Sequence, residues 1–123
     1  MRDDTKTTIQ ELKQEITDFR IERDWTQFSD PYDLAAAISI EANELLELFL
    51  WKKPADVQAL LQEKGFFAER VAEEIADIVV YCLVFSHATG IDLSTAITEK
   101  MKKNRLKYPI EAVKGKRVDK HAR

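Results

Sequence analysis

The chain has 123 residues, enough to bury one hydrophobic core and too few for two domains of ordinary size. Hydrophobic residues make up 45% and charged residues 33%, with only three Gly and three Pro, a composition that favours an all-α fold over a many-turned β fold. A net charge of -3 gives no overall attraction to a nucleic-acid polymer, and the longest apolar run, "IVVYCLVF", is well short of the ~20 residues that a membrane span needs. We therefore expect a soluble, cytoplasmic, single-domain protein.

Three elements are predicted in the first half of the chain. Apolar residues recur every three or four positions over 7–23, which indicates an amphipathic helix. Asp30 followed by Pro31 is a strong start signal for a second helix over 31–52, because Asp can cap free amide groups and Pro tolerates the first helical position. The segment 55–64, bracketed by Pro and Gly, is predicted to be a short helix or an ordered loop.

Two further helices follow. No Gly or Pro interrupts the chain over 66–89, which is predicted to be a third long helix. Asp92 can cap a fourth, which should end near Tyr108 because the residue before a proline disfavours helical geometry. The residues from about 112 onward are predicted to be a flexible, solvated tail of the one domain, 1–123.

Two carboxylate pairs lie on helix faces that ought to be buried. With residues about 100° apart around a helix, Glu41 falls in the middle of an apolar stripe and Glu44 at its edge. Glu74 and Asp77 repeat the arrangement in the third long helix. Ordinary solvated surface would explain one such pair, but four buried carboxylates facing one another need a cation between them. An all-oxygen ligand set favours Mg²⁺, with Mn²⁺ as the substitute, over zinc.

Other residues could bind the phosphates and the base of a nucleotide. Lys100 and Asn104 lie one turn apart in a cation-rich helix. The cations alone are explained by the dipole at a helix C-terminus, whereas Asn104 is a poor helix former that can pair with a base or sugar edge. Trp25 and Trp51 could stack on a nucleobase, although aromatic residues at such positions are more often part of the core. Only the combination favours a nucleotide site.

Several segments together resemble the MazG-like, all-α nucleoside triphosphate pyrophosphohydrolases, and most closely the single-domain branch that includes the dCTP pyrophosphatases. They are "ERDWTQF" at 22–28, "EANELLELFLW" at 41–51, "EEIADIVVYCL" at 73–83 and "KMKKNRLKYP" at 100–109. The resemblance implies a four-helix-bundle-like protomer that assembles through helix packing into homo-tetramers built from paired dimers. It also implies hydrolysis of a nucleoside triphosphate to the monophosphate and pyrophosphate, in a role such as nucleotide-pool cleansing.

The resemblance also implies roles for particular residues. The positions that hold Mg²⁺ in the family match Glu41, Glu44, Glu74 and Asp77. The aromatic positions lining the base pocket match Trp25 and Trp51, and the positions contacting the nucleotide match Tyr81, Lys100 and Asn104. Animal members tend to have His where this chain has Ser29, so a base contact made by that His does not carry over and cytosine specificity is weakened.

The working hypothesis is in-line attack of water on the α-phosphorus, with Glu44 facing the water and Lys100 binding the departing pyrophosphate. One alternative is a non-enzymatic helical regulatory or binding module, in which the carboxylates form only a polar seam. Within the same fold, a phosphoribosyl-ATP or dUTP pyrophosphohydrolase is the other alternative. The tryptophan pair favours a base-stacking dNTP enzyme.

Overall fold

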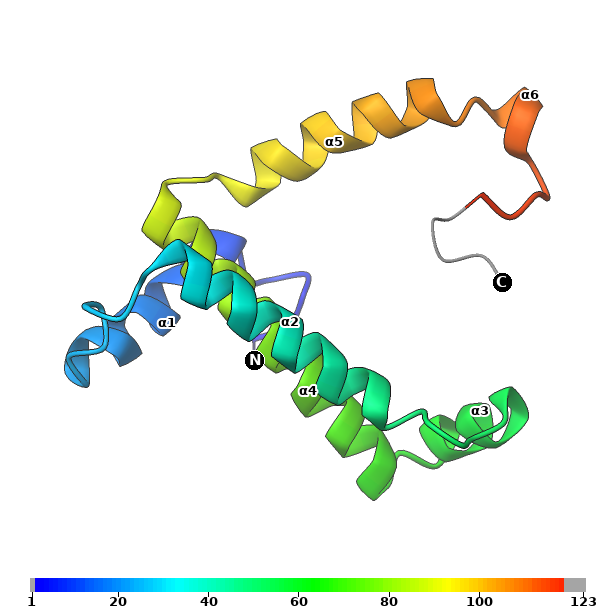
Figure 1. Ribbon diagram of the computed structural model, residues 1–123, viewed down its shortest axis with the longest axis horizontal. Coiled ribbons are helices and arrows are strands. Elements are labelled where there is room, and N and C mark those ends of the chain that lie inside the picture. The colour runs from blue at the N-terminus through cyan, green and yellow to red at the C-terminus, as the bar shows by residue number, and fades with distance from the viewer. Residues whose placement is uncertain (1, 119–123) are drawn as a thin grey trace. The chain divides into compact units, whose positions relative to one another are not determined.

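The computed structural model describes residues 2–118, and every regular element within that range is a helix, which confirms the all-α class (Figure 1). The chain divides into two compact units, residues 1–90 and 91–123. The first unit contains α1 (Ile9–Glu22), α2 (Pro31–Glu47), α3 (Pro54–Glu63) and α4 (Phe66–Thr89), and the second contains α5 (Leu93–Lys107) and α6 (Ile110–Val113). In the described range no single helix is long and apolar enough to cross a membrane.

Local signals in the sequence explain where the helices begin and end. Thr8 and Glu11 form a capping box at the start of α1. The side chain of Asp30 accepts hydrogen bonds from the amides of Tyr32 and Asp33 at the start of α2. Gly90 ends α4 in the left-handed region, at φ 73°, where a residue without Cβ avoids strain. The predicted bounds of α4 are therefore confirmed.

The second helix ends earlier than the sequence indicates, at Glu47 rather than near Lys52. The amides of Leu48, Phe49 and Leu50 bond to carbonyls three residues back, so the helix tightens into a turn. Trp51 then adopts a left-handed φ of 65°, which is incompatible with a right-handed α-helix. The segment after it forms a regular helix, α3, which resolves the choice between a helix and a loop.

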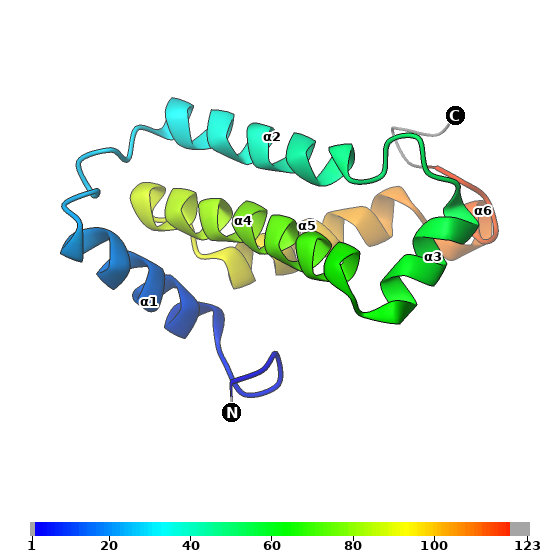
Figure 2. The ribbon, with the colours of Figure 1, turned by 90° about the horizontal axis from the view of Figure 1, so that it is seen from below.

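The core of the first unit is built around α4. Helices α1, α2 and α3 all pack against α4, and α2 runs antiparallel beside it (Figures 1 and 2). The most buried side chains are Leu34 on α2 and Leu83, Val84 and Ser86 on α4. The hydroxyl of Ser86 donates to the carbonyl of Leu83 at 2.9 Å, so this buried polar group is satisfied within its own helix.

The structure protects the apolar stripes predicted on α2 and α4 from solvent. On α2 and at its C-cap, the buried or half-buried stripe residues are Leu34, Ala37, Ile38, Leu45 and Leu48. On α4, they are Phe67, Val71, Ile78, Tyr81 and Phe85. Glu41 and Glu74 are half-buried within these stripes. Two carboxylates are thus held on the packed faces of neighbouring helices.

The second unit consists of α5 and the short α6. Asp92 caps α5 by accepting from the amide and the hydroxyl of Thr95 at 3.0 and 2.7 Å. The single turn of α6 lies where the predicted C-terminal tail begins. Residues 119–123, the end of that tail, lie outside the described range.

Candidate metal and nucleotide site

Three of the predicted carboxylates lie together between α2 and α4. Glu41 and Glu44 come from successive turns of α2, and Glu74 comes from the facing side of α4. Each offers one carboxylate oxygen, and the three oxygens lie within 4.8 Å of one another. Among the described residues, this close set does not include Asp77. The spacing of i and i+3 on α2 places two carboxylates on one face, and antiparallel packing supplies the third.

The cluster leaves polar atoms without partners. One oxygen each of Glu41 and Glu74, Oε2 in both, is buried and accepts no hydrogen bond. Arg70 Nη2 lies 4.0 Å from Glu74 Oε1, at the limit of an ion pair. Buried carboxylate oxygens without a donor are costly, and a hard divalent cation accepts such oxygens as ligands. The donor set therefore fits Mg²⁺ or Mn²⁺.

The electrostatics of the cluster favour a bound cation. Partial burial is the main cause that raises the pKa of Glu41 above its ordinary value, followed by a shared hydrogen bond and charge repulsion with Glu44. Burial is also the main cause that raises the pKa of Glu74, followed by the charge of Glu44. The charge of Asp77 adds to both shifts, whereas Arg70 lowers the pKa of Glu74. The combined negative charge of these carboxylates is larger than the single positive charge of Arg70 can offset.

A pocket of about 230 Å³ adjoins the cluster. Its wall includes Glu41 and Asp77 together with the aromatic rings of Trp25 and Tyr81. Trp25 contacts Phe19 edge to face, with ring centroids 5.8 Å apart, and remains 46% exposed. An aromatic ring held at its edge and open on part of its surface can stack on a planar ligand. Glu41 belongs to both features, so the cluster and the pocket are adjacent.

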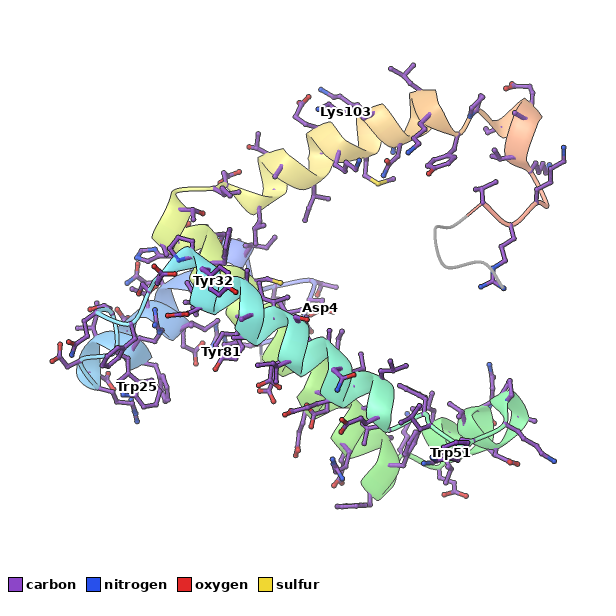
Figure 3. All side chains as sticks on the ribbon, in the orientation of Figure 1. Asp4, Trp25, Tyr32, Trp51, Tyr81 and Lys103 are labelled. Atoms are coloured by element: carbon purple, nitrogen blue, oxygen red, sulfur yellow. The ribbon has the colours of Figure 1, made fainter. Side chains whose placement is uncertain are left out.

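Trp51 is not among the residues that line this pocket, and Lys100 and Asn104 belong to the second compact unit. Trp51 is fully exposed and lies beside α3, well away from both Trp25 and Tyr81 (Figure 3). Lys100 is exposed on α5 and Asn104 is half-buried there, both in the second compact unit. The amide of Asn104 contacts the sulfur of Met101 at 3.8 Å. Their nucleotide contacts stay predictions.

The structure adds pocket residues that sequence reasoning did not single out. Ile16, Phe19 and Arg20 of α1 line the pocket with Val80 and Val84 of α4. The apolar repeat of α1 identifies Ile16 and Phe19 as residues facing the protein, but not which ligand they face. Arg20 has no such signal in the sequence, because its position depends on how α1 packs against α4.

The model of the MazG-like family matches residues 36–120. The chain belongs to the MazG-like family. This MazG-like chain is 34% identical over 110 residues to dCTP pyrophosphatase 1 of Rattus norvegicus, covering 88% of this chain and 63% of the relative. It is 34% identical over 105 residues to dCTP pyrophosphatase 1 of Homo sapiens, covering 83% of this chain and 59% of the relative. It therefore spans less than two thirds of the length of these relatives.

A solved structure shares the fold of this MazG-like chain. A pyrophosphatase of Archaeoglobus fulgidus superimposes with a TM-score of 0.74 and 38% sequence identity. The match covers 82% of this chain and 92% of the archaeal one. At this level of identity, the likeness extends to sequence as well as to helix arrangement.

Proposed function

We propose that the chain is a metal-dependent nucleoside triphosphate pyrophosphohydrolase that converts a deoxynucleoside triphosphate, with dCTP the first to test, to the monophosphate and pyrophosphate. The observation that carries the proposal is that Glu41 belongs both to the three-carboxylate cluster and to the wall of the Trp25 pocket. A metal site next to an aromatic pocket suits a ligand with phosphates at one end and a base at the other. The relatives named as pyrophosphatases support this reaction class.

Glu41, Glu44 and Glu74 would hold Mg²⁺, with Asp77 completing the acidic set from the pocket wall. When bound, the cation neutralises charge on the phosphate oxygens. The buried Oε2 atoms of Glu41 and Glu74 support this assignment, because neither atom accepts a hydrogen bond from the protein. Mn²⁺ has the same preference for oxygen ligands and is the expected substitute.

The chain's own residues then take separate roles in the reaction. Glu44 is the exposed member of the cluster, so it can reach a water molecule, orient it and accept its proton. The water attacks the α-phosphorus in line, and the bond from that phosphorus to the bridging oxygen of the pyrophosphate breaks. Trp25 stacks on the base and Tyr81 contacts the nucleotide. Lys100 and Asn104 remain predicted contacts, with Lys100 on the departing pyrophosphate.

The protein is also proposed to act as a homo-oligomer, a dimer or a tetramer of paired dimers. Large apolar side chains on α2 and α4 are exposed in the single chain, including Ile40, Leu46, Ile75 and Val79. Trp51 can enter a base pocket only if a second copy presents it or its segment moves. Light scattering coupled to size exclusion measures the assembly directly, and a monomer at all concentrations would remove this part of the proposal.

The reaction is tested by identifying the products after incubation with each common dNTP and NTP, with and without Mg²⁺. The proposal expects a monophosphate and pyrophosphate from the wild type, and neither from Glu74→Ala. Turnover of dUTP or phosphoribosyl-ATP alone would move the chain to another activity of the same fold. No turnover of any triphosphate by a folded, metal-binding sample would favour the binding-module alternative.

A further inference from the structure

Arg20, near the end of α1, is tied to the loop that carries Trp25. Its Nη1 donates to the hydroxyl of Ser29 at 3.1 Å. Its Nη2 donates to the carbonyls of Trp25 and Phe28, both at 3.0 Å. In the other direction, the amide of Trp25 donates to the carbonyl of Arg20 at 2.9 Å. One residue thus fastens both the first and the last part of the loop 25–29 to the helix.

A guanidinium is suited to this task in a way that other side chains are not. Its N–H groups point outward in a fixed planar fork, so it can bind several acceptors at once without rearranging. The three acceptors around Arg20 are uncharged, and hydrogen bonds from an ionised donor are stronger than bonds between neutral groups. Lysine would keep the charge but not the fork.

The loop has features that make an external tie important. It leaves α1 through Asp24, which adopts a left-handed φ of 54°. Its own hydrogen bonds are short-range, such as the bond from the hydroxyl of Ser29 to the carbonyl of Thr26 at 2.6 Å. Trp25 is anchored on one edge by Phe19, and half of its surface is exposed. The place of the Trp25 ring therefore depends on where the loop is held.

We propose that Arg20 is a positioning residue for the base pocket: by binding Trp25, Phe28 and Ser29 it holds the Trp25 ring at the pocket wall. This inference rests on the proposed function, since the ring it positions is the one expected to stack on the base. Ser29 takes part in the same network, so its hydroxyl also helps to hold the loop. Arg20 lines the pocket beside Trp25 and acts through it.

The test compares Arg20→Met and Arg20→Lys with Arg23→Met as the matched control. Arg23 stands one turn further along, and its guanidinium stacks on Phe19 and donates to the Phe19 carbonyl, with no bond to the loop 25–29. For the substrate that the wild type turns over best, Arg20→Met is expected to raise KM by about 10-fold, a large part of the value of base stacking, with kcat within about twofold. Arg20→Lys is expected to recover part of the loss, and Arg23→Met to leave KM near the wild-type value.

A second readout does not need turnover. In a Trp51→Phe background, used for fluorescence only, acrylamide quenching reports the exposure of Trp25. Quenching should increase in Arg20→Met, increase less in Arg20→Lys, and stay unchanged in Arg23→Met. Far-UV circular dichroism checks that each variant keeps its helices, and Arg20→Lys supplies the test if Arg20→Met does not fold.

Unchanged KM and unchanged quenching in both Arg20 variants would overturn the proposal. Equal effects from Arg20→Met and Arg23→Met would also overturn it, because they would show a general effect of the α1 terminus. If the wild type turns over no triphosphate, the proposed function fails by itself, while the quenching series still decides whether Arg20 positions Trp25.

Discussion

Replacing Trp25 with Ala removes the ring that lines the pocket beside Glu41. Stacking of a base on an aromatic side chain is worth about 1–3 kcal/mol, which corresponds to a weakening of roughly 5- to 150-fold. The ring is half-exposed and contacts Phe19 only edge to face, so the fold loses about 0.5–1.5 kcal/mol from that pair. We therefore expect KM to rise within the stacking range, while kcat and the helical content change little, as measured by steady-state kinetics with Mg²⁺ and circular dichroism.

Phe66→Ala is the control for this prediction, because Phe66 is an exposed aromatic residue outside the pocket. Trp25→Phe should lie between the wild type and Trp25→Ala, since a smaller ring still stacks. A KM for Trp25→Ala within about twofold of the wild type, below the lowest value expected for stacking, would refute the base-pocket assignment. A rise in Trp51→Ala as well would mean that Trp51 reaches the pocket, either from a second copy or by movement of its segment.

Three further predictions concern the cluster and the core. Glu74→Gln should abolish both turnover and the stabilisation of the fold by Mg²⁺. Without metal, this variant should melt at a higher temperature than the wild type, because the substitution removes a half-buried charge. A lower melting temperature would contradict this prediction. In EDTA, the wild type should become more stable as the pH falls from neutral toward the ordinary pKa of Glu. The reason is that the raised pKa values of Glu41 and Glu74 make the folded state bind protons more readily than the unfolded state. A melting temperature that stays flat or falls with decreasing pH would argue against these raised pKa values. Leu83→Ala should lower the free energy of unfolding, measured in urea titrations, by about 2–5 kcal/mol, because Leu83 is only 3% exposed. The control Leu106→Ala, at an exposed position, should lower it by about 0.5 kcal/mol or less. Equal losses in the two variants would mean that the core is not centred on α4.

The sign of the pH effect follows from proton binding. A carboxyl group whose pKa is higher in the folded state stabilises the fold fully below its unfolded pKa. That contribution is lost as the pH rises through the folded pKa, so metal-free protein weakens toward neutral pH. Bound Mg²⁺ should reverse the trend, because it requires Glu41 and Glu74 to be ionised. Removing both charges by Glu41→Gln and Glu74→Gln should flatten the pH dependence.

Much of the fold could be predicted because its signals are local. Gly65 and Gly90 bracket α4, and the Asp30–Pro31 pair marks the start of α2. The end of α2 could not be predicted, because neither Gly nor Pro marks the left-handed turn at Trp51. The helical spacing of apolar residues continues past Glu47, so it does not show that the helix tightens into a turn and ends there.

The candidate site divides along the same line. The half-buried positions of Glu41 and Glu74 follow from helix periodicity, because both fall in apolar stripes. The separation of Asp77 from the close carboxylate set depends on how two helices are rotated against each other, which no single-helix pattern encodes. The same is true of Arg20, whose partners lie in a loop and whose pocket neighbours lie on α4. The tertiary packing of the helices therefore determines where Asp77 and Arg20 lie in the site.

The most direct test of the account is hydrolysis of dCTP in oxygen-18 water with Mg²⁺, followed by mass spectrometry and phosphorus NMR, for the wild type and Glu74→Ala. The account predicts that the wild type forms dCMP and pyrophosphate, with the heavy oxygen in dCMP, and that folded Glu74→Ala forms neither. Heavy oxygen in inorganic phosphate with dCDP as the other product would place the attack on the γ-phosphorus, and equal turnover by Glu74→Ala would remove the carboxylate cluster from the reaction. Either result would contradict the account.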